Sequence, residues 1–273
     1  MARSTVTMSM VSALSHNLPA TLSAGAAALA YAVLAGAHTR LTPASARQVM
    51  LLAWGLHLLT LVLSLFATPA RFGFAPALSV TGWLVLTVYL IESRLYPQLK
   101  ARWTLAVLGT LVVLLALVFP GAPYPALGSA WLPLHWALGI ASYGLIATAV
   151  AHAWLMQRAE RAMRAGLTTE ADMPLLTLER LTFRFVGAGF VVLGATLLAG
   201  WWFSEGLVHR WVWNHKTVFS VLAWLTMGVL LLGRWRLGWR GRTAVRTLYL
   251  GAGFLLLGYA GSRFVLEVLL HRA

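Results

Sequence analysis

The chain has 273 residues, of which 60% are hydrophobic, and it carries 21 Lys and Arg against 7 Asp and Glu. Soluble domains average about 45–50% apolar and about 25% charged residues, so this composition excludes a soluble enzyme and a disordered chain. The absence of cysteine excludes disulfides, Cys-ligated metals and thiol exchange by the chain itself. In so apolar a chain, a net charge of +14 predicts loops that lie against anionic lipid, and no nucleic-acid partner.

A helix that crosses a bilayer needs about 20 apolar residues. We expect helices, because no apolar segment alternates with the period of a strand and a helix pairs its own backbone groups in lipid. The predicted fold is an all-α integral membrane protein with eight helices in one bundle, a single domain over residues 1–273. The predicted spans are Leu18–Ala37, Val49–Phe66, Phe74–Ile91, Trp103–Phe119, Trp131–Met156, Thr182–Phe203, Thr217–Gly233 and Leu248–Leu270.

Basic residues predict the orientation. Of the 21 Lys and Arg residues, 14 fall in the loops after the first, third, fifth and seventh spans, and Arg184 lies at the edge of one of them. These 15 residues place those loops in the cytoplasm and both termini outside it. The longest of these loops, residues 157–181, is expected to begin as a continuation of the fifth helix. After Met173-Pro174 we expect a short amphipathic segment that runs through Arg184.

Ionisable residues inside the spans are the first candidates for function, because burying them in lipid is costly. His57 lies in the middle of the second span, and His135 and His152 lie near opposite ends of the fifth. Seventeen residues of helix separate the last two by roughly 25 Å, so one cofactor cannot bind both. For each histidine, a hydrogen bond to a neighbouring helix is the alternative explanation. Arg263 and Glu267 lie four apart and are expected to neutralise each other.

The external segment 201–217 is the most unusual part of the sequence, with four tryptophans, two histidines and two basic residues. An aromatic belt at the membrane surface accounts for a tryptophan or two at a helix end. A flat apolar ligand with acidic groups, such as haem, is the alternative: tryptophans stack on its faces, basic residues bind its carboxylates, and histidine binds its iron.

Part of this segment resembles the tryptophan-rich signature of the CcsA-like cytochrome c assembly family. The matching residues are Trp211-Val212-Trp213-Asn214-His215-Lys216-Thr217. The resemblance is strongest to its HemX/YpjD-type inner-membrane subgroup and covers residues 131–267. Three further pieces carry it: Leu134-His135-Trp136 with Ala141-Ser142-Tyr143-Gly144, the run Leu178–Arg184 with Gly189-Phe190, and Gly238-Trp239-Arg240-Gly241-Arg242 with Gly253-Phe254.

The resemblance implies that the chain handles haem for c-type cytochrome maturation in a bacterial inner membrane. It implies apocytochrome c and a membrane partner with an external domain as partners, besides the lipid bilayer. His135 is then the leading iron ligand, and His57 is a candidate for a second haem within the membrane. The implied haem-binding residues of the loop are His209, Arg210, Trp211, Trp213, Asn214, His215 and Lys216.

The sequence also departs from the family pattern. The signature acid is Asn214, the acid after the lysine is Thr217, and two expected histidine ligands are missing. A non-haem membrane scaffold or regulatory subunit that keeps the family fold is therefore the alternative function, and a transporter of another amphipathic substrate ranks below both. No catalytic residue is expected, because the sequence shows no nucleophile–base pair; the chain is at most one component of a haem attachment system.

The expected topology is testable with reporter fusions after Thr39, Phe119, Gly166, Arg210 and Arg240. These should read inside, outside, inside, outside and inside in turn, because the basic loops stay in the cytoplasm. An inside signal at Arg210 would contradict both the topology and an external haem loop.

Overall fold

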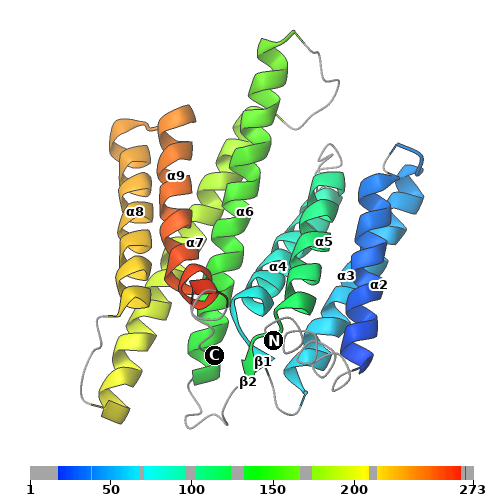
Figure 1. The fold of residues 1–273 in the computed structure, drawn as a ribbon. Helices are drawn as coiled ribbons and strands as arrows, with labels where there is room; N and C mark the ends of the chain where they lie inside the picture. The colour runs from blue at the N-terminus through cyan, green and yellow to red at the C-terminus, as the bar shows by residue number, and fades with distance from the viewer. Residues whose placement is uncertain are drawn as a thin grey trace. The chain divides into compact units, whose positions relative to one another are not determined.

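The computed structural model describes residues 18–37, 39–67, 71–95, 102–123, 132–166, 174–208, 214–265 and 268. Within them the protein is helical apart from one two-residue strand pair, and seven helices are long and apolar enough to cross a membrane (Figure 1). The helix of the fourth predicted span, Arg102–Val118, is apolar but has only 17 residues. The helices are α2 (Leu18–Gly36), α3 (Pro43–Leu65), α4 (Phe74–Leu95), α5 (Arg102–Val118), α6 (Leu132–Arg164), α7 (Leu175–Val208), α8 (His215–Leu237) and α9 (Gly241–Leu256), followed by the π-helix η1 (Leu257–Gly261) and the short α10 (Ser262–Phe264).

The chain divides into two compact units, which we describe separately. Unit 1 contains α2, α3, the first part of α4 through Thr87, and α5. Unit 2 contains the last part of α4 from Val88, and α6 to α10.

Small residues allow the helices of unit 1 to approach closely. On α2 the buried face is made mainly of alanines, and Tyr31 on the same helix is fully buried. A Cβ on Gly109 of α5 would lie 3.0 Å from the Tyr31 ring, so the absence of a side chain at Gly109 makes room for the tyrosine. Trp54 of α3 stacks on Trp83 of α4 and donates a hydrogen bond of 2.8 Å to Thr87.

The strands β1 (Arg71–Phe72) and β2 (Ala122–Pro123) pair antiparallel, with Arg71 opposite Pro123. The sequence did not predict strands. A pair this short is below the length at which alternation can be detected.

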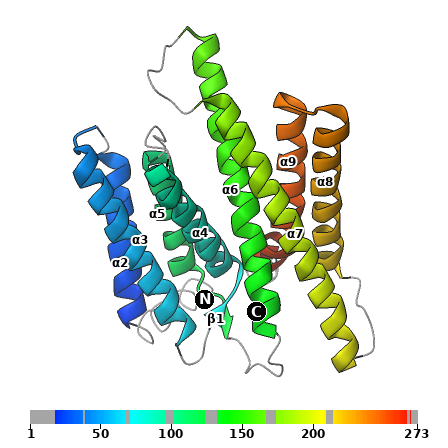
Figure 2. The same cartoon turned by 180° about the vertical axis from the view of Figure 1, so that it is seen from behind.

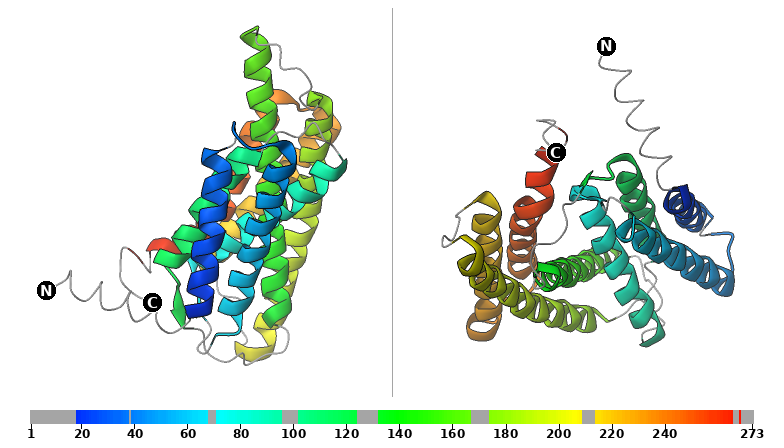
Figure 3. Two further views of the ribbon diagram at one scale, coloured as in Figure 1. Left: turned by 90° about the vertical axis from the view of Figure 1, so that its right-hand side faces the viewer. Right: turned by 90° about the horizontal axis from the view of Figure 1, so that it is seen from below.

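Unit 2 is organised around α6 and α7, which run antiparallel along each other (Figure 2). Glycine makes this contact close: a Cβ on Gly189 of α7 would lie only 2.7 Å from Cγ1 of Ile146 on α6. Viewed from below in Figure 3, α6 lies against α7 on one side and α9 on another.

An ion-pair cluster joins α7 to the turn between α8 and α9. Glu179 of α7 pairs with Arg234 of α8 at 2.6 Å and with Arg240, just before α9, at 3.2 Å. The Arg234 guanidinium also lies 4.7 Å from the centroid of the Phe183 ring. Two of the arginines predicted to contact lipid therefore also hold three helices together.

Two predicted boundaries are wrong. The expected amphipathic segment Pro174–Arg184 is not separate: α7 runs without a break from Leu175 to Val208, so it includes both this segment and the sixth span. The segment 201–217 is not one loop, because Trp201 and Trp202 lie on α7 and Lys216 lies in the first turn of α8. Hydropathy marks the thickness of the membrane, whereas a helix continues beyond it wherever its polar residues are good helix formers.

Gly189→Ala should lower the stability of the protein by about 1–3 kcal/mol, because the added methyl group has to displace the branched Ile146 side chain. Thermal unfolding of the purified protein in detergent measures the change. Gly187→Ala is the matched control on the same helix, since no atom lies within 4 Å of a Cβ there. Equal effects of the two substitutions would contradict the close α6–α7 contact.

Candidate functional site

One end of unit 2 brings together four chain segments that are distant in sequence. α6 begins there, α7 ends, α8 begins, and η1 follows α9, at the bottom of Figure 1. We call this the His135 end. The opposite end, where α6 finishes and α8 turns into α9, we call the basic end, after the excess of basic residues in its loops.

His135 lies one turn into α6, and its ring packs on α7. A Cβ on Gly200 would lie 3.1 Å from Cε1 of His135 and 3.6 Å from Nδ1, but 4.0 Å from Nε2. The Cε1–Nδ1 edge of the ring therefore faces α7. Nδ1 of His135 is buried and makes no well-formed hydrogen bond. The backbone of Thr196, one turn before Gly200, is the polar group that interacts with the imidazole.

Two cationic side chains share the same end. Lys216, in the first turn of α8, places Nζ 5.8 Å from the centroid of the Tyr259 ring in η1. Arg263 of α10 lies near enough for its charge to act on Lys216. η1 lies close to the first turn of α8 here, since a Cβ on Gly258 would make an ordinary contact of 3.5 Å with the carbonyl oxygen of Lys216.

The π-helix is held by hydrogen bonds on both sides. The hydroxyl of Tyr143 on α6 donates to the carbonyl of Leu255, just before η1. The Ser262 hydroxyl lies 3.1 Å and 3.0 Å from the carbonyls of Gly258 and Tyr259. π-turns interrupt regular helices frequently at functional sites, and this one sets the position of Tyr259 relative to Lys216.

Asn214 caps α8. Its side-chain oxygen accepts hydrogen bonds from the Thr217 backbone N–H at 3.0 Å and from the Thr217 hydroxyl at 3.1 Å. His215 follows as the first residue of α8 and is exposed. His209, Arg210, Trp211, Trp213 and Glu267 lie outside the described residues.

His57 is enclosed within unit 1. Its ring is fully buried, its Nε2 lies 2.8 Å from the Ser79 hydroxyl, and the Tyr31 ring meets it edge-on at 5.9 Å. Its Nδ1 atom has no hydrogen-bond partner. The arrangement matches the alternative of a histidine bonded to a neighbouring helix.

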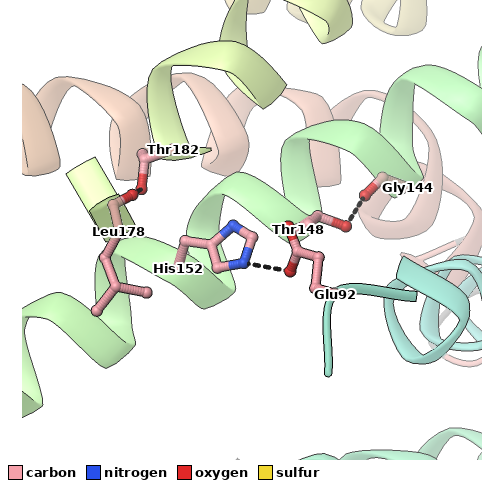
Figure 4. Close-up of polar contacts among 6 residues, drawn as sticks. All are labelled: Glu92, Gly144, Thr148, His152, Leu178 and Thr182. Carbon is pink, nitrogen blue, oxygen red and sulfur yellow. Dashed lines mark hydrogen bonds and ion pairs between the residues drawn. The ribbon is translucent and has the colours of Figure 1, made fainter. Parts of the chain in front are cut away.

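His152 has a partner that the sequence analysis missed. Its Nε2 lies 2.8 Å from Oε2 of Glu92 on α4, and both side chains are buried (Figure 4). Glu92 directly follows the predicted third span, which the structure extends to Leu95. The position of this acidic residue, immediately after an apolar run, was the sequence signal that could have marked it as a partner for a buried histidine.

The described residues at the His135 end are compatible with a haem site, and they supply part of its set of ligands. The Cε1–Nδ1 edge of the His135 ring faces α7, so Nε2 is the ring nitrogen that could bind iron. Lys216 and Arg263 provide positive charge for propionates. Among the described residues, no group of three or more His, Cys, Asp and Glu side chains is arranged to hold a bare metal ion.

Comparisons with known proteins identify the family of the chain. The family model for cytochrome C assembly protein matches residues 44–270. The chain is 32% identical over 138 residues to inner membrane protein YpjD of Escherichia coli, which covers 50% of this chain and 52% of YpjD. It is 24% identical over 238 residues to the cytochrome c biogenesis protein CcsA of Synechococcus elongatus, which covers 78% of this chain and 73% of CcsA.

An uncharacterized 28.8 kDa protein of Azospirillum brasilense is 36% identical over 146 residues, which covers 51% of this chain and 53% of that protein. The chain thus spans about half the length of this relative and of YpjD. No solved structure matches the chain.

Asn214→Ala should destabilise the start of α8 by about 1 kcal/mol, because the cap of the Thr217 N–H is lost. Asn214→Asp should keep or raise stability, since a carboxylate accepts the same bonds and is favoured at a helix N-terminus. Thermal unfolding in detergent measures both. A loss of stability in Asn214→Asp equal to that in Asn214→Ala would contradict the capping role.

Proposed function

Because the chain belongs to the cytochrome c assembly protein family, we propose that it binds and presents haem in the inner membrane for attachment to an apocytochrome c. It is a multi-pass membrane protein by its helices, and a relative described as an inner membrane protein supports that location. Haem is the cargo in this proposal, and the site lies at the His135 end of unit 2.

The position of His135 is the observation that carries the proposal. Its ring rests on Gly200 with the Cε1–Nδ1 edge toward α7, which leaves Nε2 as the nitrogen for iron. Packing on a helix backbone fixes the ring before haem arrives, so little side-chain freedom is lost on binding. His215 or His209 is the candidate ligand for the opposite face of the iron.

Charge at the same end suits the rest of the cargo. Haem carries two propionate groups, and Lys216, Arg263 and Arg210 are the cations for them. Trp211 and Trp213 are the proposed stacking walls. Asn214, as the cap of α8, holds the end of this segment at the first turn that carries Lys216.

Partners follow from the composition. Attachment of haem to a c-type cytochrome uses cysteine thiols of the apocytochrome, and this chain has no cysteine with which to manage them. We therefore infer that it works with a membrane partner whose external domain handles the apocytochrome, and that it is a component of an attachment system.

The direct test is the absorption spectrum of protein purified from haem-replete cells. Wild type should show a Soret band, and His135→Ala should lose most of it or shift it, because the leading ligand is gone. Wild type without any haem would favour the alternative function of a non-haem scaffold. An unchanged spectrum in His135→Ala would assign the iron to another ligand.

Gly200→Ala tests whether the packing of the His135 ring on Gly200 matters, without removing the ligand. The added methyl would approach Cε1 of His135 to 3.1 Å, so the ring has to shift, and the Soret band should weaken or move. Gly139→Ala on α6 is the matched control, because its Cβ would make only an ordinary contact of 3.7 Å with Thr196. If both variants keep the wild-type spectrum, Gly200 does not position the ligand.

A further inference from the structure

Glu92 and His152 form a buried pair near the basic end of unit 2. Glu92 lies on the last turns of α4, His152 lies on α6, and they meet at 2.8 Å although 60 residues separate them in sequence (Figure 4). Their exposed fractions are 6% and 3%, and each lies within a candidate membrane span.

The surroundings of the pair offer little to stabilise a charge. The Phe185 ring of α7 covers the imidazole at a centroid distance of 5.4 Å. The buried hydroxyls of Thr148 and Thr182 donate to carbonyls of their own helices, those of Gly144 and Leu178. Among the described residues, neither Glu92 nor His152 has a second ion-pair partner.

The cations nearest in sequence are not buried with the pair. Arg94 on α4, Arg158 on α6 and Arg184 on α7 are all exposed, and Arg158 lies over the exposed Trp154 ring. A carboxylate beside a neutral histidine would therefore be an uncompensated negative charge in apolar surroundings, which is strongly disfavoured. One added proton removes that net charge, whether it sits on the carboxyl or on the imidazole.

We propose that Glu92 and His152 are a proton-binding site, which holds one proton between them in addition to the one on the neutral imidazole. The Glu92 carboxyl and Nε2 of His152 share that proton. Nδ1 of His152 is buried without a hydrogen-bond partner, so the imidazole presents a second nitrogen, on the side away from Glu92, through which a proton can leave or enter.

This site is separate from the proposed haem site. His135 and His152 are both on α6, and seventeen residues of helix place them roughly 25 Å apart. The pair does not rest on haem binding, and neither site's failure would imply failure of the other.

Infrared difference spectra of the full-length protein in lipid nanodiscs test the proposal. Spectra recorded on the acid and alkaline sides of the titration should show a change in carboxyl or imidazolium bands, and ¹³C-labelled glutamate should shift the carboxyl part. Glu92→Gln and His152→Gln should each remove this change. Glu160→Gln is the matched control, because Glu160 pairs with Arg164 on the surface of the same helix at 3.0 Å and its loss should leave the signal of the buried pair intact.

The outcomes are distinct. Loss of the signal in both pair variants, with retention in Glu160→Gln, supports a proton-binding site. Wild-type protein with no titrating buried group over its stable pH range would overturn it, and this result needs no variant that folds. A titrating signal unchanged by Glu92→Gln would also overturn it, since the proton would then belong to other residues.

Discussion

The close antiparallel contact of α6 and α7 is the constraint on which unit 2 depends. Ile146 reaches into the space left by Gly189, and the His135 ring lies on Gly200 three turns further along α7. Tight packing of this kind tolerates little added volume, so it fixes both the distance between the helices and their register. The register in turn decides which face of α6 carries His135 against α7 and which carries His152 toward α4.

Charged side chains from different helices lie close together on both sides of this helix pair. Among the described acids of unit 2, Glu92 and Glu179 each have a basic or protonatable partner from a different helix, whereas Glu160 pairs within α6. The Glu179 cluster joins α7 to α8 and to the start of α9 at the basic end. At the His135 end the positive charges of Lys216 and Arg263 lie close together, which is an arrangement suited to an anionic ligand.

In the described part of the chain, each of the eight predicted spans falls on a helix, in the expected order, because long apolar runs have few alternatives in a membrane chain. The sequence also predicted that α6 continues past the fifth span through Gln157, because the polar residues there are good helix formers. It did not predict that α7 begins as early as Leu175, since residues such as Glu179 are polar but compatible with a helix. The N-terminus of α8 was placed within two residues, although its cap signal, Asn214 with Thr217 three residues later, was read as part of a loop.

The contacts of the candidate site were less accessible to sequence reasoning. His135 was recognised as a candidate, but the contact of its ring with Gly200 depends on the register of α6 and α7. Such a contact produces no pattern in the local sequence. Glu92 was missed for a similar reason: its partner is 60 residues away and only the fold brings them together. The π-helix that positions Tyr259 also could not be predicted, because the apolar residues Leu257–Gly261 look like any other part of a membrane helix.

The most direct test of the account is haemin titration of His135→Gly in the absence and presence of imidazole, followed in the Soret region. The account predicts weak binding with an altered band in the absence of imidazole. Added imidazole should then restore the wild-type band, because it fills the space of the missing side chain and supplies the ligand nitrogen. Wild-type binding without imidazole would contradict the claim that His135 holds the iron.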